Sequence, residues 1–154
     1  MAGHQSSETE PTPGRPRPPG VLILIGILIA LTSSRILAVA FIPKLEMFGG
    51  VAANAWLGPW VVDGILGLIL PVALIMMYRV RGPRIWGALL IYNSLGAFDY
   101  LNGLLTQSMH PLPESVAPAW LVLGSLVFTL VVQLLCVGLL LRQDVSAHFL
   151  HRAS

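Results

Sequence analysis

Charged side chains are scarce in this chain: Asp, Glu, Lys and Arg make up 10% of its 154 residues, whereas 55% are apolar. A soluble domain carries roughly 25% charged residues, because its surface needs groups that water solvates. The composition therefore excludes a monomeric soluble globule and predicts a membrane protein, with the lipid bilayer as its main partner.

Cysteine is nearly absent as well. One cysteine excludes an internal disulfide framework and a cysteine-based zinc site. The formal net charge of +2 is too small for a nucleic-acid-binding footprint, so we expect no nucleic-acid partner. All four histidines lie outside the long apolar runs, and the sequence has no H-E-x-x-H, C-x-x-C or G-x-S-x-G motif. We therefore expect no cofactor and no metal, and we assign no catalytic residue.

Residues 1–20 form a polar segment with five prolines between positions 11 and 19. Proline lacks the backbone N–H that a helix needs, and nothing in this segment could build a core. We expect a disordered, cytoplasmic N-terminal tail.

Four long apolar runs follow, at residues 21–42, 57–78, 85–105 and 119–141. Each is close to the roughly 20 residues that cross about 30 Å of hydrocarbon as a helix. The runs are too long for strands and show no alternation of period two. The sequence thus predicts an all-α fold, a bundle of four transmembrane helices, followed by a cytoplasmic C-terminal tail at residues 143–154.

The distribution of basic residues predicts the topology. With the N-terminus inside, one residue, Lys44, lies outside, and seven lie on the cytoplasmic side: Arg15, Arg17, Arg79, Arg81, Arg84, Arg142 and Arg152. Cytoplasmic segments of membrane proteins are enriched in Lys and Arg. We expect a multi-pass protein of the inner cell membrane with both termini in the cytoplasm.

A cleaved secretory signal is the alternative for the first run. Residues 21–31 are apolar, and the triplet Ala38-Val39-Ala40 is typical of a signal cleavage site. The apolar character continues through Ile42, which favours a retained first helix.

Three ionisable residues fall inside the predicted spans: Arg35, Asp63 and Asp99. A charge at mid-helix costs about 2.5–3.5 kcal/mol on insertion scales, so each needs a partner or a function. At about 1.5 Å per residue, all three lie roughly 9–10 Å from the outer ends of their helices. Two interpretations stay open: a structural clasp that fixes helix register, or the lining of an outward-facing polar pocket.

Helical periodicity supplies candidate neighbours. Asn93, Asp99 and Tyr100 fall on one arc of the third span with Gly96 and Gly103, and Trp60 shares a face with Asp63. The opposite side of the third span, with Ile91, Leu95 and Phe98, suits lipid. The candidate ligand-binding or clasp residues are Arg35, Asp63, Asp99, Asn93, Tyr100 and Trp60.

Other polar residues are more simply explained by helix packing. An interhelical amide hydrogen bond accounts for Asn93 and Gln133 without a ligand. Ser125 and Thr129 belong to a stripe on the fourth span that we interpret as packing contacts.

The segment from Trp60 through Asp63 and Gly64, followed by N-x-x-G-x-x-D at residues 93–99, resembles a pattern of small four-helix bacterial integral membrane proteins. The resemblance covers roughly residues 56–141. It implies a fold and a membrane location but no reaction, and it does not include Arg35.

We expect a membrane protein without catalytic activity that binds a small or lipid-like ligand, or a partner protein, in a polar pocket. Association into a homo-oligomer or with another membrane protein is open. One alternative is a membrane-embedded enzyme that uses Asp63 or Asp99 for acid–base chemistry. The other is a structural or assembly subunit in which the charges only clasp the helices.

Overall fold

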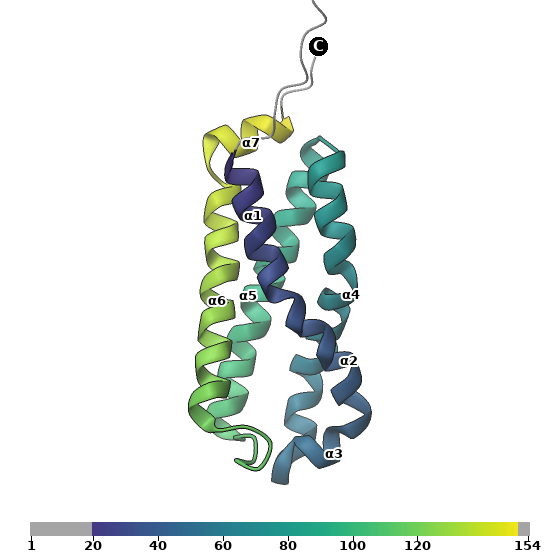
Figure 1. Ribbon diagram of the computed structural model, residues 1–154, viewed down its shortest axis with the longest axis vertical. Helices are drawn as coiled ribbons and strands as arrows, with labels where there is room; N and C mark the ends of the chain where they lie inside the picture. The colour runs from purple at the N-terminus through teal and green to yellow at the C-terminus, as the bar shows by residue number, and fades with distance from the viewer. Residues whose placement is uncertain (1–19, 151–154) are drawn as a thin grey trace, which may run out of the picture.

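The computed structural model describes residues 20–150, and this part of the chain is helical, without strands (Figure 1). The predicted N-terminal tail lies almost wholly outside the described residues. The elements, in chain order, are α1 (Gly20–Leu31), η1 (Thr32–Leu37), α2 (Ala38–Phe41), η2 (Ile42–Lys44), α3 (Leu45–Phe48), η3 (Gly50–Trp56), α4 (Leu57–Arg79), α5 (Pro83–Met109), α6 (Ala119–Leu140) and α7 (Gln143–Leu150). Elements labelled η are 3₁₀ helices.

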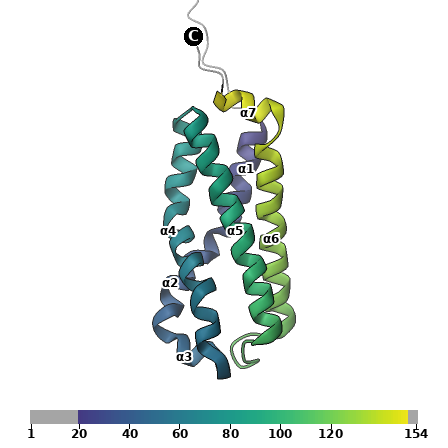
Figure 2. The ribbon, with the colours of Figure 1, turned by 180° about the vertical axis from the view of Figure 1, so that it is seen from behind.

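Three helical segments are long and apolar enough to cross a membrane: Gly20–Phe48, Gly50–Arg79 and Ala119–Leu140. Helix α5 is not among them, although it has 27 residues and runs the length of the bundle between α4 and α6 (Figure 2). It carries more polar side chains than the other long helices, and several of them are buried, including Asn93, Asp99, Thr106 and Gln107.

The outward side of α5 is apolar, as its periodicity predicts. Ile91, Leu95 and Phe98 are 62%, 50% and 68% exposed. Large exposed apolar side chains also cover α1, α4 and α6. Such a surface suits hydrocarbon, because in water it would far exceed the patches that soluble monomers expose.

The first helical segment crosses the bundle on a diagonal (Figure 1). Helix α1 packs on α6 near the α7 end, whereas η1 and α2 pack on α4. A Cβ atom on Gly67 would lie 2.8 Å from the Cα atom of Ile36, so the glycine permits the backbones of α4 and η1 to approach closely.

The 3₁₀ stretch interrupts what the sequence presents as one continuous span. It begins in the run Thr32-Ser33-Ser34, whose hydroxyl groups compete for backbone carbonyls. The Thr32 hydroxyl donates to the Ile29 carbonyl at 2.8 Å. A 3₁₀ stretch in the middle of a helix often marks a hinge or a functional site, and this one carries Arg35.

Two apolar clusters fill the bundle. The larger lies toward the α7 end and includes Leu22, Ile29 and Leu140; the smaller consists of Ala38, Trp56 and Trp60 with side chains around α3. Arg35 falls between Ile29 and Ala38 in the chain, and Asp63 falls just after Trp60. A polar layer therefore separates the two clusters.

The C-terminal segment contains a short helix. Residues 143–150 form α7, which lies across the end of the bundle where α1 begins (Figure 1). Val145 and Phe149, four residues apart on one face, are buried against the bundle. A search for long apolar runs does not detect a helix of eight amphipathic residues.

Candidate functional site

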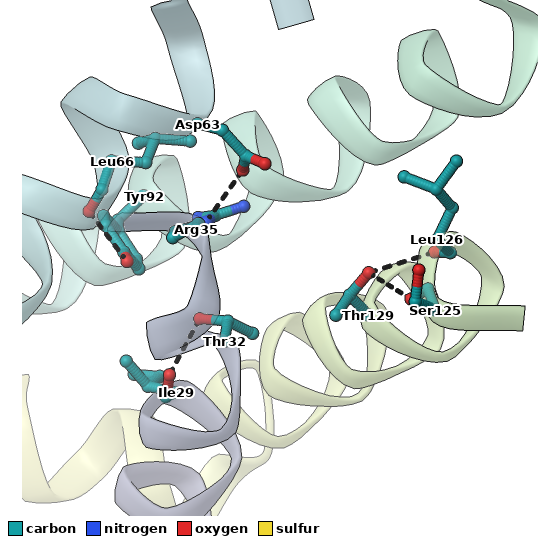
Figure 3. Close-up of polar contacts among 9 residues, drawn as sticks. All are labelled: Ile29, Thr32, Arg35, Asp63, Leu66, Tyr92, Ser125, Leu126 and Thr129. Carbon is teal, nitrogen blue, oxygen red and sulfur yellow. Dashed lines mark hydrogen bonds and ion pairs between the residues drawn. The ribbon is translucent and has the colours of Figure 1, made fainter. Parts of the chain in front are cut away.

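Arg35 and Asp63 form an ion pair across η1 and α4. The Arg35 Nε donates to the Asp63 Oδ1 at 3.1 Å (Figure 3). The Arg35 side chain has no exposed area, whereas that of Asp63 is 21% exposed. The structure thus brings together two of the three charges that the sequence places at one depth.

Two tyrosines of α5 surround the guanidinium group. The Arg35 Cζ lies 4.9 Å from the centroid of the Tyr100 ring and 6.0 Å from that of Tyr92. A cation over an aromatic face gains about 0.5–2 kcal/mol, with the larger values in desolvated sites. The Tyr92 hydroxyl is itself held by a 3.2 Å bond to the Leu66 carbonyl.

Asp99, the third predicted charge, joins the same layer from α5. It is 4% exposed, and its carboxyl group lies within hydrogen-bonding reach of Asp63. Its Oδ1 atom has no hydrogen-bond partner. Arg35 therefore does not bind two carboxylates bidentately, as a tight clasp between three helices would.

Most of the hydrogen-bonding capacity of Arg35 is unused. Both terminal nitrogens, Nη1 and Nη2, are buried without a hydrogen-bond partner. Buried polar groups are normally satisfied, and an unpaired one costs about 1–3 kcal/mol, more for a charged group. An unsatisfied guanidinium group deep in the bundle therefore points to a missing partner.

A cavity of about 150 Å³ adjoins this group. Its walls come from η1, α4, α5 and α6, and it is lined by Ser34, Arg35, Asp63, Tyr100, Ser125, Leu126 and Thr129. At about 30 Å³ per water, the volume corresponds to roughly five water molecules. Figure 3 shows Arg35 and Asp63 on one side and Ser125 and Thr129 of α6 on the other.

The cavity is lined in part by exposed side chains. Two lining residues, Ser34 on η1 and Ser125 on α6, are exposed. No residue of the η2–α3–η3 segment or of the loop at residues 110–118 lines the cavity. At that end, Trp56 packs under Leu112 and donates from its Nε1 to the His110 carbonyl at 2.9 Å.

Besides Asp99, two further predicted candidates do not line the cavity. Trp60 belongs to the aromatic cluster, with ring centroids 5.8 Å from Phe41 and 6.1 Å from Trp56. Asn93 is fully buried, and its Nδ2 donates to the Leu89 carbonyl of its own helix at 2.7 Å. Neither residue lines the cavity.

The expected interhelical amide bond is not formed. The Oδ1 of Asn93 and both amide atoms of Gln133 are buried without partners. Gln133 instead packs directly over Gly96, where a Cβ atom would come within 2.9 Å of its Cδ. The glycine makes room for the amide, but no donor or acceptor of α5 meets it.

Tyr92 and the serine and threonine of α6 extend the site beyond the predicted set. Tyr92 lies seven residues before Asp99, a helical spacing that could have identified it. Ser125 and Thr129 line the cavity, although the Thr129 hydroxyl also donates to the Ser125 carbonyl at 2.7 Å. Packing and pocket lining are thus compatible roles for the same stripe.

Comparison of the chain with family models, with curated proteins and with solved structures finds no match. The resemblance to small four-helix membrane proteins stays a prediction.

Proposed function

We propose that this chain is a four-span protein of the inner cell membrane that binds a small or lipid-like ligand in the cavity beside Arg35. The observation that carries the proposal is a fully buried guanidinium group whose two terminal nitrogens lack partners next to a cavity. A ligand with oxygen acceptors would supply those partners.

The four-span topology rests on α5 as the additional span. It lies beside α4 and α6 along their length, and it buries its polar side chains while exposing apolar ones. The α4–α5 turn and the junction of α6 and α7 lie at the end of the bundle where α1 begins, and α3 lies toward the other end (Figure 1). In the sequence, the turn and the junction carry Arg81 and Arg142, and Lys44 directly precedes α3. This distribution supports cytoplasmic termini.

A purely structural clasp accounts less well for the geometry. A structural clasp is most stable when the guanidinium group donates two parallel hydrogen bonds to a carboxylate. Arg35 engages one carboxylate oxygen through Nε alone, and Asp99 keeps an unpartnered oxygen. Acid–base catalysis needs a substrate group within reach of a carboxyl group, and no observation favours it over binding.

The test compares ligand retention with stability. Native mass spectrometry of gently solubilised protein should detect a bound small molecule or lipid in the wild type. The double variant Arg35→Met/Asp63→Leu should lose it and keep its thermal stability, because replacing both partners of a buried ion pair by apolar side chains of similar volume is often neutral or stabilising. Arg142→Gln, at the exposed Arg142–Asp144 pair, is the matched control and should retain the ligand.

Two outcomes would contradict the proposal. One is retention of the ligand by the double variant. The other is a loss of thermal stability that matches the loss of ligand, which a clasp between helices would produce.

A further inference from the structure

The charges around the cavity form a bipolar pair. Arg35 contributes one positive charge, and its Nε is bound to Asp63. Among the residues that line the cavity, Asp63 is the one acid and Arg35 is the one base. The cluster then holds one positive and one negative charge, with no net charge.

Arg35 and Asp63 differ in the hydrogen bonds that each can still form. The Arg35 terminal nitrogens are donors without acceptors. The Asp63 side chain keeps 21% of its area exposed and lines the cavity, so it can accept from a ligand. A ligand that complements both charges carries an anionic oxygen group for Arg35 and a positively charged hydrogen-bond donor for Asp63.

The hydroxyl groups on the cavity wall fit the same ligand. Ser34, Ser125 and Thr129 each bring a hydroxyl group to the lining. The Ser125 and Thr129 hydroxyls already donate to backbone carbonyls of α6, so their oxygens are left to accept from an ammonium group. They therefore complement a polar ligand group without adding net charge.

The position of the mouth indicates where the ligand comes from. Ser34 and Ser125 lie on two elements whose neighbouring exposed side chains are apolar, such as Leu31 and Phe128. A mouth between them faces the hydrocarbon and not the end of the bundle. A cavity of about 150 Å³ accommodates a small polar group, while acyl chains would remain outside, against α1 and α6.

From these contacts we infer that the cavity binds a zwitterionic ammonium–phosphate group, entering sideways between η1 and α6 as the headgroup of an aminophospholipid. The phosphate oxygens accept from the Arg35 terminal nitrogens, and the ammonium group donates to Asp63. Since the Tyr100 ring lies over the guanidinium group, binding requires the ring or the guanidinium group to turn. The inference rests on the proposed function and adds the ligand class and its route.

The first experiment measures headgroup selectivity. Delipidated protein is titrated with phosphatidylethanolamine or phosphatidylglycerol of identical acyl chains, and bound lipid is counted by native mass spectrometry. We expect at least a tenfold preference for phosphatidylethanolamine, the lipid with the ammonium group. Asp63→Asn should reduce the preference to about one, and Arg35→Gln should abolish the binding of both lipids.

Soluble O-phosphoethanolamine distinguishes the source of the group. If the lipid is the ligand, a millimolar excess of the soluble compound should not displace it, because the acyl chains contribute to binding. Displacement with equal affinity would support the zwitterion chemistry and overturn the lipid source. Equal binding of the two lipids would overturn the zwitterion assignment but leave ligand binding at Arg35 intact.

The second experiment tests the route. Ser34→Cys and Ser125→Cys are labelled with a bulky maleimide; wild type is the unlabelled control because its single cysteine, Cys136, is buried. Labelling at either position should lower phosphatidylethanolamine binding at least fivefold, whereas labelling of Ser94→Cys, an exposed position on α5 outside the cavity lining, should not. Equal effects at all three positions would overturn entry between η1 and α6.

Discussion

The Arg35 Nε donates to the Asp63 Oδ1 at 3.1 Å, while Nη1 and Nη2 of the same guanidinium group are buried without a hydrogen-bond partner. The bond orients the group but leaves its terminal nitrogens without acceptors. A residue that is so expensive to bury and so incompletely paired is better explained by a ligand than by packing.

The Tyr100 ring should contribute to the stability of the buried guanidinium group. Tyr100→Leu removes the aromatic face that lies 4.9 Å from the Arg35 Cζ, and we expect a loss of about 1–2 kcal/mol. Tyr100→Phe retains the face and should cost less than half as much. Thermal unfolding in detergent measures both; equal losses would show that the hydroxyl group and not the ring matters.

Gly67 should be required for the contact between α4 and η1. Gly67→Ala places a Cβ atom 2.8 Å from the backbone of Ile36, and relieving that overlap should cost about 1–3 kcal/mol. Gly138→Ala on α6 is the control, because a Cβ atom there meets nothing within 4 Å. The control should be neutral or slightly stabilising, since alanine favours helices. A neutral Gly67→Ala would contradict the close approach.

Gln133 should be replaceable without loss of stability. Both of its amide atoms are buried without partners, so Gln133→Leu removes two unsatisfied groups at similar volume. We expect unchanged or higher thermal stability. A loss of more than about 1 kcal/mol would show that the amide makes a contact that this account lacks.

The docking of α7 should weaken at mildly acidic pH. Partial burial, and then the positive charge of Arg81, lower the pKa of His148 below its ordinary 6.5. The docked state therefore favours the neutral imidazole. The stabilisation of α7 docking by the neutral imidazole is fully present above about pH 6.5, and it is lost as the pH falls below that value. Asp144, on the same helix, is paired with Arg142, and its lowered pKa keeps it ionised throughout this range.

Hydrogen exchange of residues 143–150, corrected for the intrinsic pH dependence, measures this effect. Protection should decrease between about pH 7.5 and 5.5 in the wild type and stay constant in His148→Gln. The same pH dependence in both proteins would rule out His148 as the titrating group.

Much of the polar layer could be predicted from the sequence, because depth depends only on residue counts along a helix. Counting residues placed Arg35, Asp63 and Asp99 at one level, and periodicity placed Tyr100 beside Asp99 and Ile91 on the outside. The rotation of one helix relative to another depends on packing, so the single bond between Arg35 and Asp63 could not be predicted.

The 3₁₀ stretch was also beyond the sequence. Hydropathy treats residues 21–42 as one helix, because the small polar residues at positions 32–34 interrupt it only briefly. The diagonal crossing depends on the contact between Gly67 and Ile36, two residues that no local pattern connects.

The most direct test of the central claim is a magnetic resonance measurement of the contact between Arg35 and a lipid phosphate. Protein labelled with ¹⁵N-arginine is reconstituted in phosphatidylethanolamine, and ¹⁵N–³¹P dipolar dephasing of the guanidinium signals is recorded by solid-state methods. The account predicts a strongly dephased signal that is absent from Arg35→Gln and present in Arg142→Gln. A spectrum in which the dephased signals are the same in all three proteins would show that Arg35 does not bind the phosphate, and would contradict the account.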